Sequence, residues 1–75
     1  MTYTVYGRPG CQPCKTAKDL LQAKGLEFAY VDVMALPKGE LHAFLEKGFK
    51  TVPQIFLGED HLGGLEELKE HLKDA

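Results

Sequence analysis

Residues 5–14 of the chain read Val5-Tyr6-Gly7-Arg8-Pro9-Gly10-Cys11-Gln12-Pro13-Cys14. Residues 2–6 overlap the start of this stretch. They alternate β-branched and aromatic side chains, which is typical of a strand. Glycine and proline dominate 7–10 and mark a turn. Pro13 suits the first turn of a helix. The stretch therefore predicts a strand that turns directly into a helix, with both cysteines at the junction.

The hydrophobic spacing after this junction predicts a helix and then a second strand. Ala17, Leu20 and Leu21 recur at the spacing of one helix face, with charged residues between them. Gly25 suits the position just past the end of that helix. Residues 26–33 are mostly apolar, so we expect a buried strand there.

The second half of the chain predicts a helix, a hairpin and a final helix. The first of these helices contains Leu41, Phe44 and Leu45 and ends near Gly48, a suitable C-terminal cap. Strands are expected at 52–57 and 61–62, joined by a loop at 58–60. The last helix presents Leu65, Leu68 and Leu72 on one face, and the expected core aromatic residues are Tyr3, Phe28, Phe44 and Phe56.

The predicted order is βαβαββα, which is an α/β fold. The first two strands require a parallel pair with a right-handed helical crossover. The hairpin adds antiparallel strands, so we expect a four-stranded mixed sheet with helices on both faces. No repeat or linker interrupts the pattern, and we expect a single domain over residues 1–75.

The size and charge of the chain argue against several classes of function. A chain of 75 residues has a small core, and we expect a stability of roughly 5 kcal/mol or less. The net charge is −2 without any run of like charges, which argues against nucleic acid and anionic membranes as partners. No apolar stretch approaches the ~20 residues of a membrane span, and residues 1–6 do not resemble a signal peptide. We expect a cytoplasmic monomer.

The two cysteines indicate redox chemistry. Both lie in one C-x-x-C pair, and a bridge across two residues constrains the unfolded chain too little to be a structural staple. The positive end of the helix dipole favours a thiolate, so we expect it to lower the pKa of the Cys11 thiol. Arg8 and Lys15 add positive charge nearby. Cys11 is then the attacking sulfur and Cys14 the resolving one.

Two other uses of the cysteine pair fit the sequence less well. A zinc site needs two further ligands, and the three histidines, His42, His61 and His71, are scattered over separate elements. A pair of inert buried cysteines does not fit the junction of a strand and a helix, which favours exposure and a reactive thiolate. Redox chemistry remains the better interpretation.

Several motifs in the same order resemble the glutaredoxins of the thioredoxin superfamily. The strand and cysteine loop at 5–14 resemble the family's active-site segment, residues 51–53 its T-V-P segment, and Gly63-Gly64 its glycine pair. The resemblance implies a thioredoxin-like fold and an electron carrier that reduces protein or glutathione mixed disulfides without a bound cofactor. It implies a cis proline at 53, which sets the Val52 backbone beside the dithiol. It also implies that the glycine pair and the start of the last helix cradle the γ-glutamyl carboxylate of glutathione. The substrate- or glutathione-binding positions that follow are Arg8, Gln12, Pro13, Thr51, Val52, Pro53, Gly63, Gly64, Leu65 and Glu66.

The sequence leaves the identity of the reductant open. Gln12 and Pro13 stand where glutaredoxins often have Pro-Tyr, and Glu40 stands near a position that usually binds the glycine carboxylate of glutathione. Residues 43–49 are similar to the NrdH-redoxins, which are reduced by thioredoxin reductase and deliver electrons to ribonucleotide reductase. A third possibility is a module in which two chains bridge an iron–sulfur cluster through Cys11 and glutathione. The partners implied are therefore glutathione or thioredoxin reductase, and disulfide-containing proteins that include ribonucleotide reductase.

Overall fold

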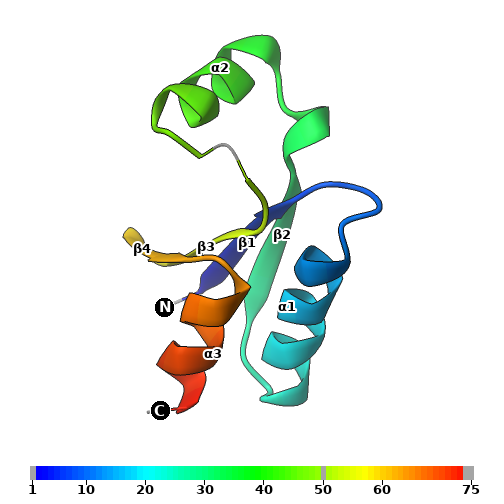
Figure 1. Cartoon of the computed structure of the whole chain (residues 1–75), viewed down its shortest axis with the longest axis vertical. Coiled ribbons are helices and arrows are strands. Elements are labelled where there is room, and N and C mark those ends of the chain that lie inside the picture. Colours follow the sequence, from blue (N-terminus) through cyan, green and yellow to red (C-terminus); the bar gives the residue numbers. More distant parts are fainter. Residues whose placement is uncertain (1, 50, 74–75) are drawn as a thin grey trace.

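The computed structural model describes residues 2–49 and 51–73, and over these residues it has the predicted element order (Figure 1). The four strands form one sheet in the order β2-β1-β3-β4. β1 pairs with β2 in parallel, whereas β1–β3 and β3–β4 are antiparallel. The α/β class and the mixed sheet are thus confirmed. The elements are β1 (Tyr3–Gly7), α1 (Gln12–Ala23), β2 (Phe28–Asp32), a 3₁₀ turn η1 (Val33–Ala35), α2 (Lys38–Glu46), β3 (Gln54–Leu57), β4 (Asp60–Gly63) and α3 (Leu65–Lys73).

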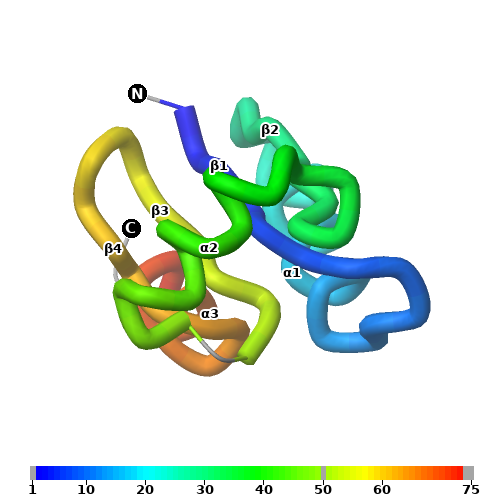
Figure 2. Tube along the Cα trace, turned by 90° about the horizontal axis from the view of Figure 1, so that it is seen from above, coloured from blue at the N-terminus to red at the C-terminus, as the bar shows by residue number. Residues whose placement is uncertain are grey.

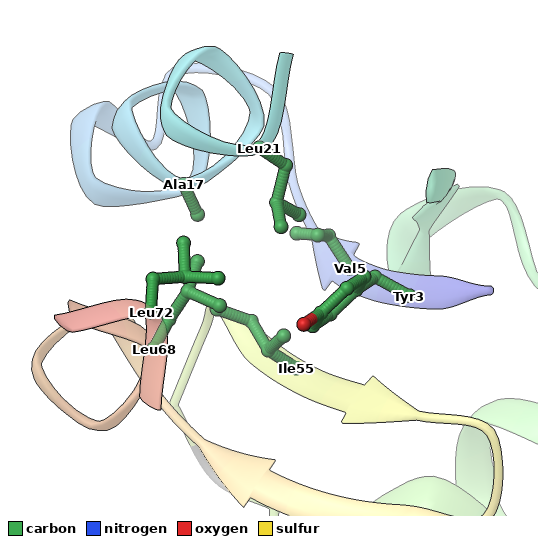
Figure 3. Close-up of a cluster of buried hydrophobic side chains, with 7 residues drawn as sticks. All are labelled: Tyr3, Val5, Ala17, Leu21, Ile55, Leu68 and Leu72. Atoms are coloured by element: carbon green, nitrogen blue, oxygen red, sulfur yellow. The ribbon is translucent and has the colours of Figure 1, made fainter. Parts of the chain in front are cut away.

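Helices α1 and α3 lie together on one face of the sheet (Figures 1 and 3). Alternation along β1 turns Tyr3 and Val5 toward them, and Ile55 joins from β3. The opposite face carries Tyr6, whose ring centroid lies 5.3 Å from that of Phe44 in α2. Helices therefore cover both faces, as predicted. The main core consists of Tyr3, Val5, Ala17, Leu21, Ile55, Leu68 and Leu72.

The second strand is shorter and more exposed than its apolar sequence predicts. β2 stands at the edge of the sheet and, among residues 2–49 and 51–73, pairs only with β1. Ala29 and Tyr30 are exposed, and Phe28 is half-buried. The predicted strand is confirmed at Phe28–Asp32, but its predicted burial was wrong, because an apolar run looks the same in a central strand and an edge strand. Phe56, also expected in the core, is half-buried within an aromatic cluster on the α2 face.

The turns and helix ends follow the sequence signals closely. Gly25 and Gly48 follow α1 and α2 with φ of +69° and +88°, a conformation that few other residues adopt. β4 begins at Asp60, one residue earlier than expected, because the hairpin turn closes on Gly58 and Glu59. Within residues 2–49 and 51–73, the helices are all too short and too polar to span a bilayer.

Seen from above, the blue loop between β1 and α1 projects from one side of the molecule (Figure 2). This loop carries the residues between Gly7 and Gln12. It is the local structure that the opening stretch predicts, and it presents the cysteine pair at the end of the central strand β1.

Candidate active site

Cys11 is the N-cap residue of α1, and its sulfur accepts the backbone N–H of Cys14 in the first turn of the helix. Its backbone is extended, with φ −89° and ψ 109°. The backbone N–H of Cys14 donates to Cys11 Sγ over 3.2 Å. Cys11 and Cys14 form a disulfide, with their Cα atoms 5.3 Å apart. In the reduced protein, the same N–H and the helix dipole stabilise a Cys11 thiolate.

The two sulfurs differ in access. Cys14 is 1% exposed, whereas Cys11 is only half-buried. Gln12 and Pro13 lie between the two cysteines in the first turn of α1, and both are exposed. A disulfide carried by a large substrate can therefore approach Cys11 but not Cys14.

The segment at 51–53 lies beside Cys11, as the resemblance implied. The peptide bond between Val52 and Pro53 is cis. The Val52 carbonyl oxygen lies 3.9 Å from Cys11 Sγ. Arg8, Thr51 and Val52 line a cavity of about 490 Å³ together with side chains from α2. The structure thus brings three predicted binding residues together beside the reactive sulfur.

A second cavity, of about 380 Å³, lies on the other side of the cysteine loop. Cys11 and Gln12 form one wall. Arg8, Lys15 and Lys18 give it a basic lining, and Tyr30 and Asp32 of β2 close it. The sequence predicts Arg8 and Lys15 near the dithiol but gives no signal for Tyr30.

The glycine pair approaches the proline segment, but its backbone is already engaged. A Cβ added at Gly64 would lie 3.5 Å from the Pro53 carbonyl oxygen, so the two segments are adjacent. The Gly64 N–H donates to Glu67 Oε1 over 2.6 Å. This is half of a capping box, in which a residue in the first turn of a helix reaches back to the N-cap. A carboxylate of the chain itself thus occupies the position that the resemblance assigned to glutathione.

Two of the predicted residues in α3 point elsewhere. Leu65 is half-buried against the main core. Glu66 is exposed and forms an ion pair with Lys69 at 3.6 Å. Glu67 is the acidic side chain that faces the glycine pair, and the spacing between Gly64 and Glu67 is the sequence signal that identifies it.

Glu40 does not lie in the cavity beside Val52. It lines a separate cavity of about 240 Å³ with Tyr6 and Phe44, and the next residue, Leu41, lines the cavity at Val52. Neighbouring positions on a helix point about 100° apart. The position of Glu40 therefore gives no reason to exclude glutathione.

The comparisons with known proteins agree with this geometry. The family profile described as "Glutaredoxin" matches residues 3–62. The chain is 38% identical to the glutaredoxin of Vibrio cholerae over 81 aligned residues, which cover 99% of this chain and 93% of the relative. Its structure resembles the solution structure of Brucella melitensis glutaredoxin, with a TM-score of 0.79, 37% identity, and coverage of 100% of this chain and 82% of the other. It also resembles the crystal structure of a buckwheat glutaredoxin–glutathione complex, with a TM-score of 0.80, 25% identity, and coverage of 96% and 68%.

The fold and the site therefore lead to one family. The order of elements and the structural matches confirm the thioredoxin-like fold. The disulfide between Cys11 and Cys14 sits at the N-terminus of α1, within the matched segment. The chain belongs to the glutaredoxin family of thiol–disulfide oxidoreductases.

Proposed function

We propose that the protein reduces protein disulfides and glutathione mixed disulfides, with Cys11 as the attacking sulfur and Cys14 as the resolving one. The observation that carries this assignment is the asymmetry of the pair. Cys11 Sγ accepts the Cys14 N–H at the end of α1 and is partly accessible, whereas Cys14 is 1% exposed. Nucleophilic attack needs an accessible thiolate, and resolution needs only an adjacent one.

The reaction then runs in two displacements. The Cys11 thiolate attacks one sulfur of the substrate disulfide, and the other substrate sulfur leaves with the electron pair. The Cys14 thiolate next attacks Cys11 Sγ, and the bond between Cys11 and the substrate breaks toward the substrate sulfur. The substrate gains two electrons and, from water, two protons, while the cysteine pair becomes the disulfide seen in this structure.

Glutathione is the reductant that the cavity lined by Arg8, Thr51 and Val52 favours. Its volume of about 490 Å³ is in the range of small-molecule sites. The Val52 backbone at its edge can pair with an extended peptide, and Arg8 offers positive charge to a carboxylate. The similar buckwheat structure is described as a complex with glutathione. Glutathione and thioredoxin both keep cytosolic thiols reduced, so the proposal places the protein in the cytoplasm.

One observation supports the alternative, in which thioredoxin reductase reduces the protein as it does the NrdH-redoxins. The Gly64 N–H already donates a hydrogen bond to the Glu67 carboxylate, over 2.6 Å. A carboxylate of glutathione has to displace Glu67 from this N–H and meets like charge while doing so.

The rate of NADPH oxidation with a small disulfide substrate distinguishes the two reductants. One reaction contains glutathione and glutathione reductase, and the other contains thioredoxin reductase alone. We expect turnover with glutathione. Turnover only with thioredoxin reductase would replace glutathione by the alternative, and turnover with neither would contradict the proposed function.

Two serine variants test the roles of the cysteines. Cys11→Ser removes the attacking sulfur, so disulfide reduction should fall to the background rate. Cys14→Ser leaves the attack intact but removes the resolving sulfur, so the protein should accumulate a mixed disulfide at Cys11. Mass spectrometry after mixing with glutathione disulfide measures the adduct. Full activity of Cys11→Ser, or a Cys14→Ser protein without adduct, would overturn the assignment.

A further inference from the structure

The buried sulfur of Cys14 and the hydroxyl group of Tyr30 both border Gly7. A Cβ added at Gly7 would lie 2.9 Å from Cys14 Sγ and 2.7 Å from the Tyr30 hydroxyl oxygen. Both atoms therefore border the space that Gly7 leaves open. Tyr30 reaches this point from β2, which pairs in parallel with the strand that ends in Gly7.

Cys14 needs a hydrogen-bond donor during the reaction. When a reductant attacks Cys11 Sγ, the disulfide breaks and the electron pair goes to Cys14, which becomes a thiolate. Cys14 is 1% exposed, so water stabilises this anion poorly, and an unpaired buried charge is unfavourable. Its own backbone N–H is directed at Cys11 Sγ rather than at its own sulfur.

Tyr30 is held in place and keeps its proton. The ammonium group of Lys18 lies 4.0 Å from the centre of the Tyr30 ring, a cation–π contact that fixes the ring against α1. Desolvation by burial and, second, the nearby Asp32 carboxylate raise the pKa of Tyr30 above its ordinary value. The hydroxyl group is therefore a donor throughout the pH range in which cysteine thiols titrate.

We propose that the Tyr30 hydroxyl donates a hydrogen bond to Cys14 Sγ whenever that sulfur is a thiolate, and so positions and stabilises the resolving cysteine. The inference rests on the proposed roles of the two cysteines. In reduction of the disulfide, Tyr30 stabilises the leaving Cys14 thiolate. In the opposite direction, it stabilises the thiolate that attacks Cys11 and displaces the substrate sulfur. The proton stays on Tyr30 in both cases, and the thiolate exchanges its proton with water.

The test is the lifetime of the mixed disulfide at Cys11 in Tyr30→Phe. Reduced protein is mixed with glutathione disulfide, quenched with acid at short times, and analysed by mass spectrometry. We expect resolution to slow about tenfold, the effect of losing one hydrogen bond to a charged group. Tyr6→Phe is the matched control, since it removes the same hydroxyl group from a ring that packs against Phe44 and Phe56 on the other face. It should resolve at the parent rate.

The pH profile separates this role from a structural one. The groups that face Tyr30 are Lys18 and Lys15 of α1, Arg8 of the loop and Asp32 of β2. Loss of the Tyr30 hydroxyl removes a donor from the buried Cys14 thiolate, so resolution in Tyr30→Phe should require a higher pH. In a Cys14→Ser background, which reports only the first attack, Tyr30→Phe should change the rate less than about twofold.

Each outcome bears on a single assignment. Tyr30→Phe with the parent adduct lifetime and pH profile would overturn the inference. The inference would also be overturned if Tyr30→Phe slowed the first attack as much as it slows resolution. The same holds if Tyr6→Phe slowed resolution as much as Tyr30→Phe, because either result indicates a general structural effect. If Cys14→Ser fails to trap an adduct, the proposed cysteine roles fail instead.

Discussion

At the scale of single residues, Gly7 is required for space rather than for backbone freedom. Gly7 does not have a positive φ, so its backbone conformation does not require glycine. Its missing side chain leaves the space into which Tyr30 and Cys14 point. The disulfide holds Cys14 in place, so the sulfur cannot move aside as a flexible side chain would.

Gly7→Ala should therefore destabilise the protein and slow resolution. The added methyl group would overlap the Tyr30 hydroxyl and Cys14 Sγ, and overpacking of this kind costs about 1–3 kcal/mol. Urea unfolding gives the free energy of unfolding, and acid-quench mass spectrometry gives the adduct lifetime.

Gly39→Ala is the control for this substitution. Gly39 lies in α2 with nothing near its missing Cβ, so alanine there should leave stability unchanged or raise it by up to about 1 kcal/mol. Equal stability of the two alanine variants would contradict the steric role of Gly7.

At the scale of elements, two helix N-termini meet the site and are capped in different ways. The N-terminus of α1 is capped by the sulfur of Cys11, which is also the reactive atom. The N-terminus of α3 is capped by Glu67, a residue of its own first turn. The first capping atom changes from a thiolate to a disulfide sulfur whenever Cys11 binds a substrate sulfur. The second capping atom, a Glu67 carboxylate oxygen, takes no part in the reaction.

Glu67→Ala should lower the free energy of unfolding by about 1 kcal/mol, the usual contribution of a cap. Glu66→Ala is the control, since Glu66 forms only an exposed ion pair with Lys69, and such pairs contribute little. Its stability should stay within about 0.5 kcal/mol of the parent. Thermal and urea unfolding followed by circular dichroism measure both. If the two variants lose the same stability, Glu67 is not the cap.

At the scale of the whole molecule, one small cluster holds the two halves of the chain together. Figure 3 shows Ala17 and Leu21 of α1 meeting Leu68 and Leu72 of α3 over Val5 and Ile55 of the sheet. The first half supplies α1 and β1, and the second half supplies α3 and β3. Their packing keeps the cysteine loop next to Val52.

Leu68→Ala should leave the protein close to its unfolding threshold. Leu68 is fully buried, and truncation of a buried leucine costs about 2–5 kcal/mol. That is comparable to the whole stability, roughly 5 kcal/mol, of a domain of this size. Leu45→Ala, at a side chain that is 49% exposed, should have a small effect. Circular dichroism during heating compares them, and a parent-like transition for Leu68→Ala would contradict this description of the core.

Much of the fold and part of the site could be predicted because the relevant signals are local. Strand and helix periods, the glycines at 25 and 48, and the placement of Cys11 at the start of a helix all depend on residues within a few positions of each other. The binding positions at 51–53 and 63–64 came from the resemblance, and the structure places both segments next to each other near Cys11.

The sequence by itself determined the element order and the chemistry of the cysteine pair, because backbone periodicity and helix capping act over short spans of chain. Only the tertiary structure decided that β2 is an edge strand, that Leu41 rather than Glu40 lines the cavity at Val52, and that the Tyr30 hydroxyl and Cys14 Sγ both border Gly7. These contacts depend on the order of strands in the sheet and on the rotation of a packed helix. Both are set by how all the apolar faces are buried together, which no short stretch of the chain specifies.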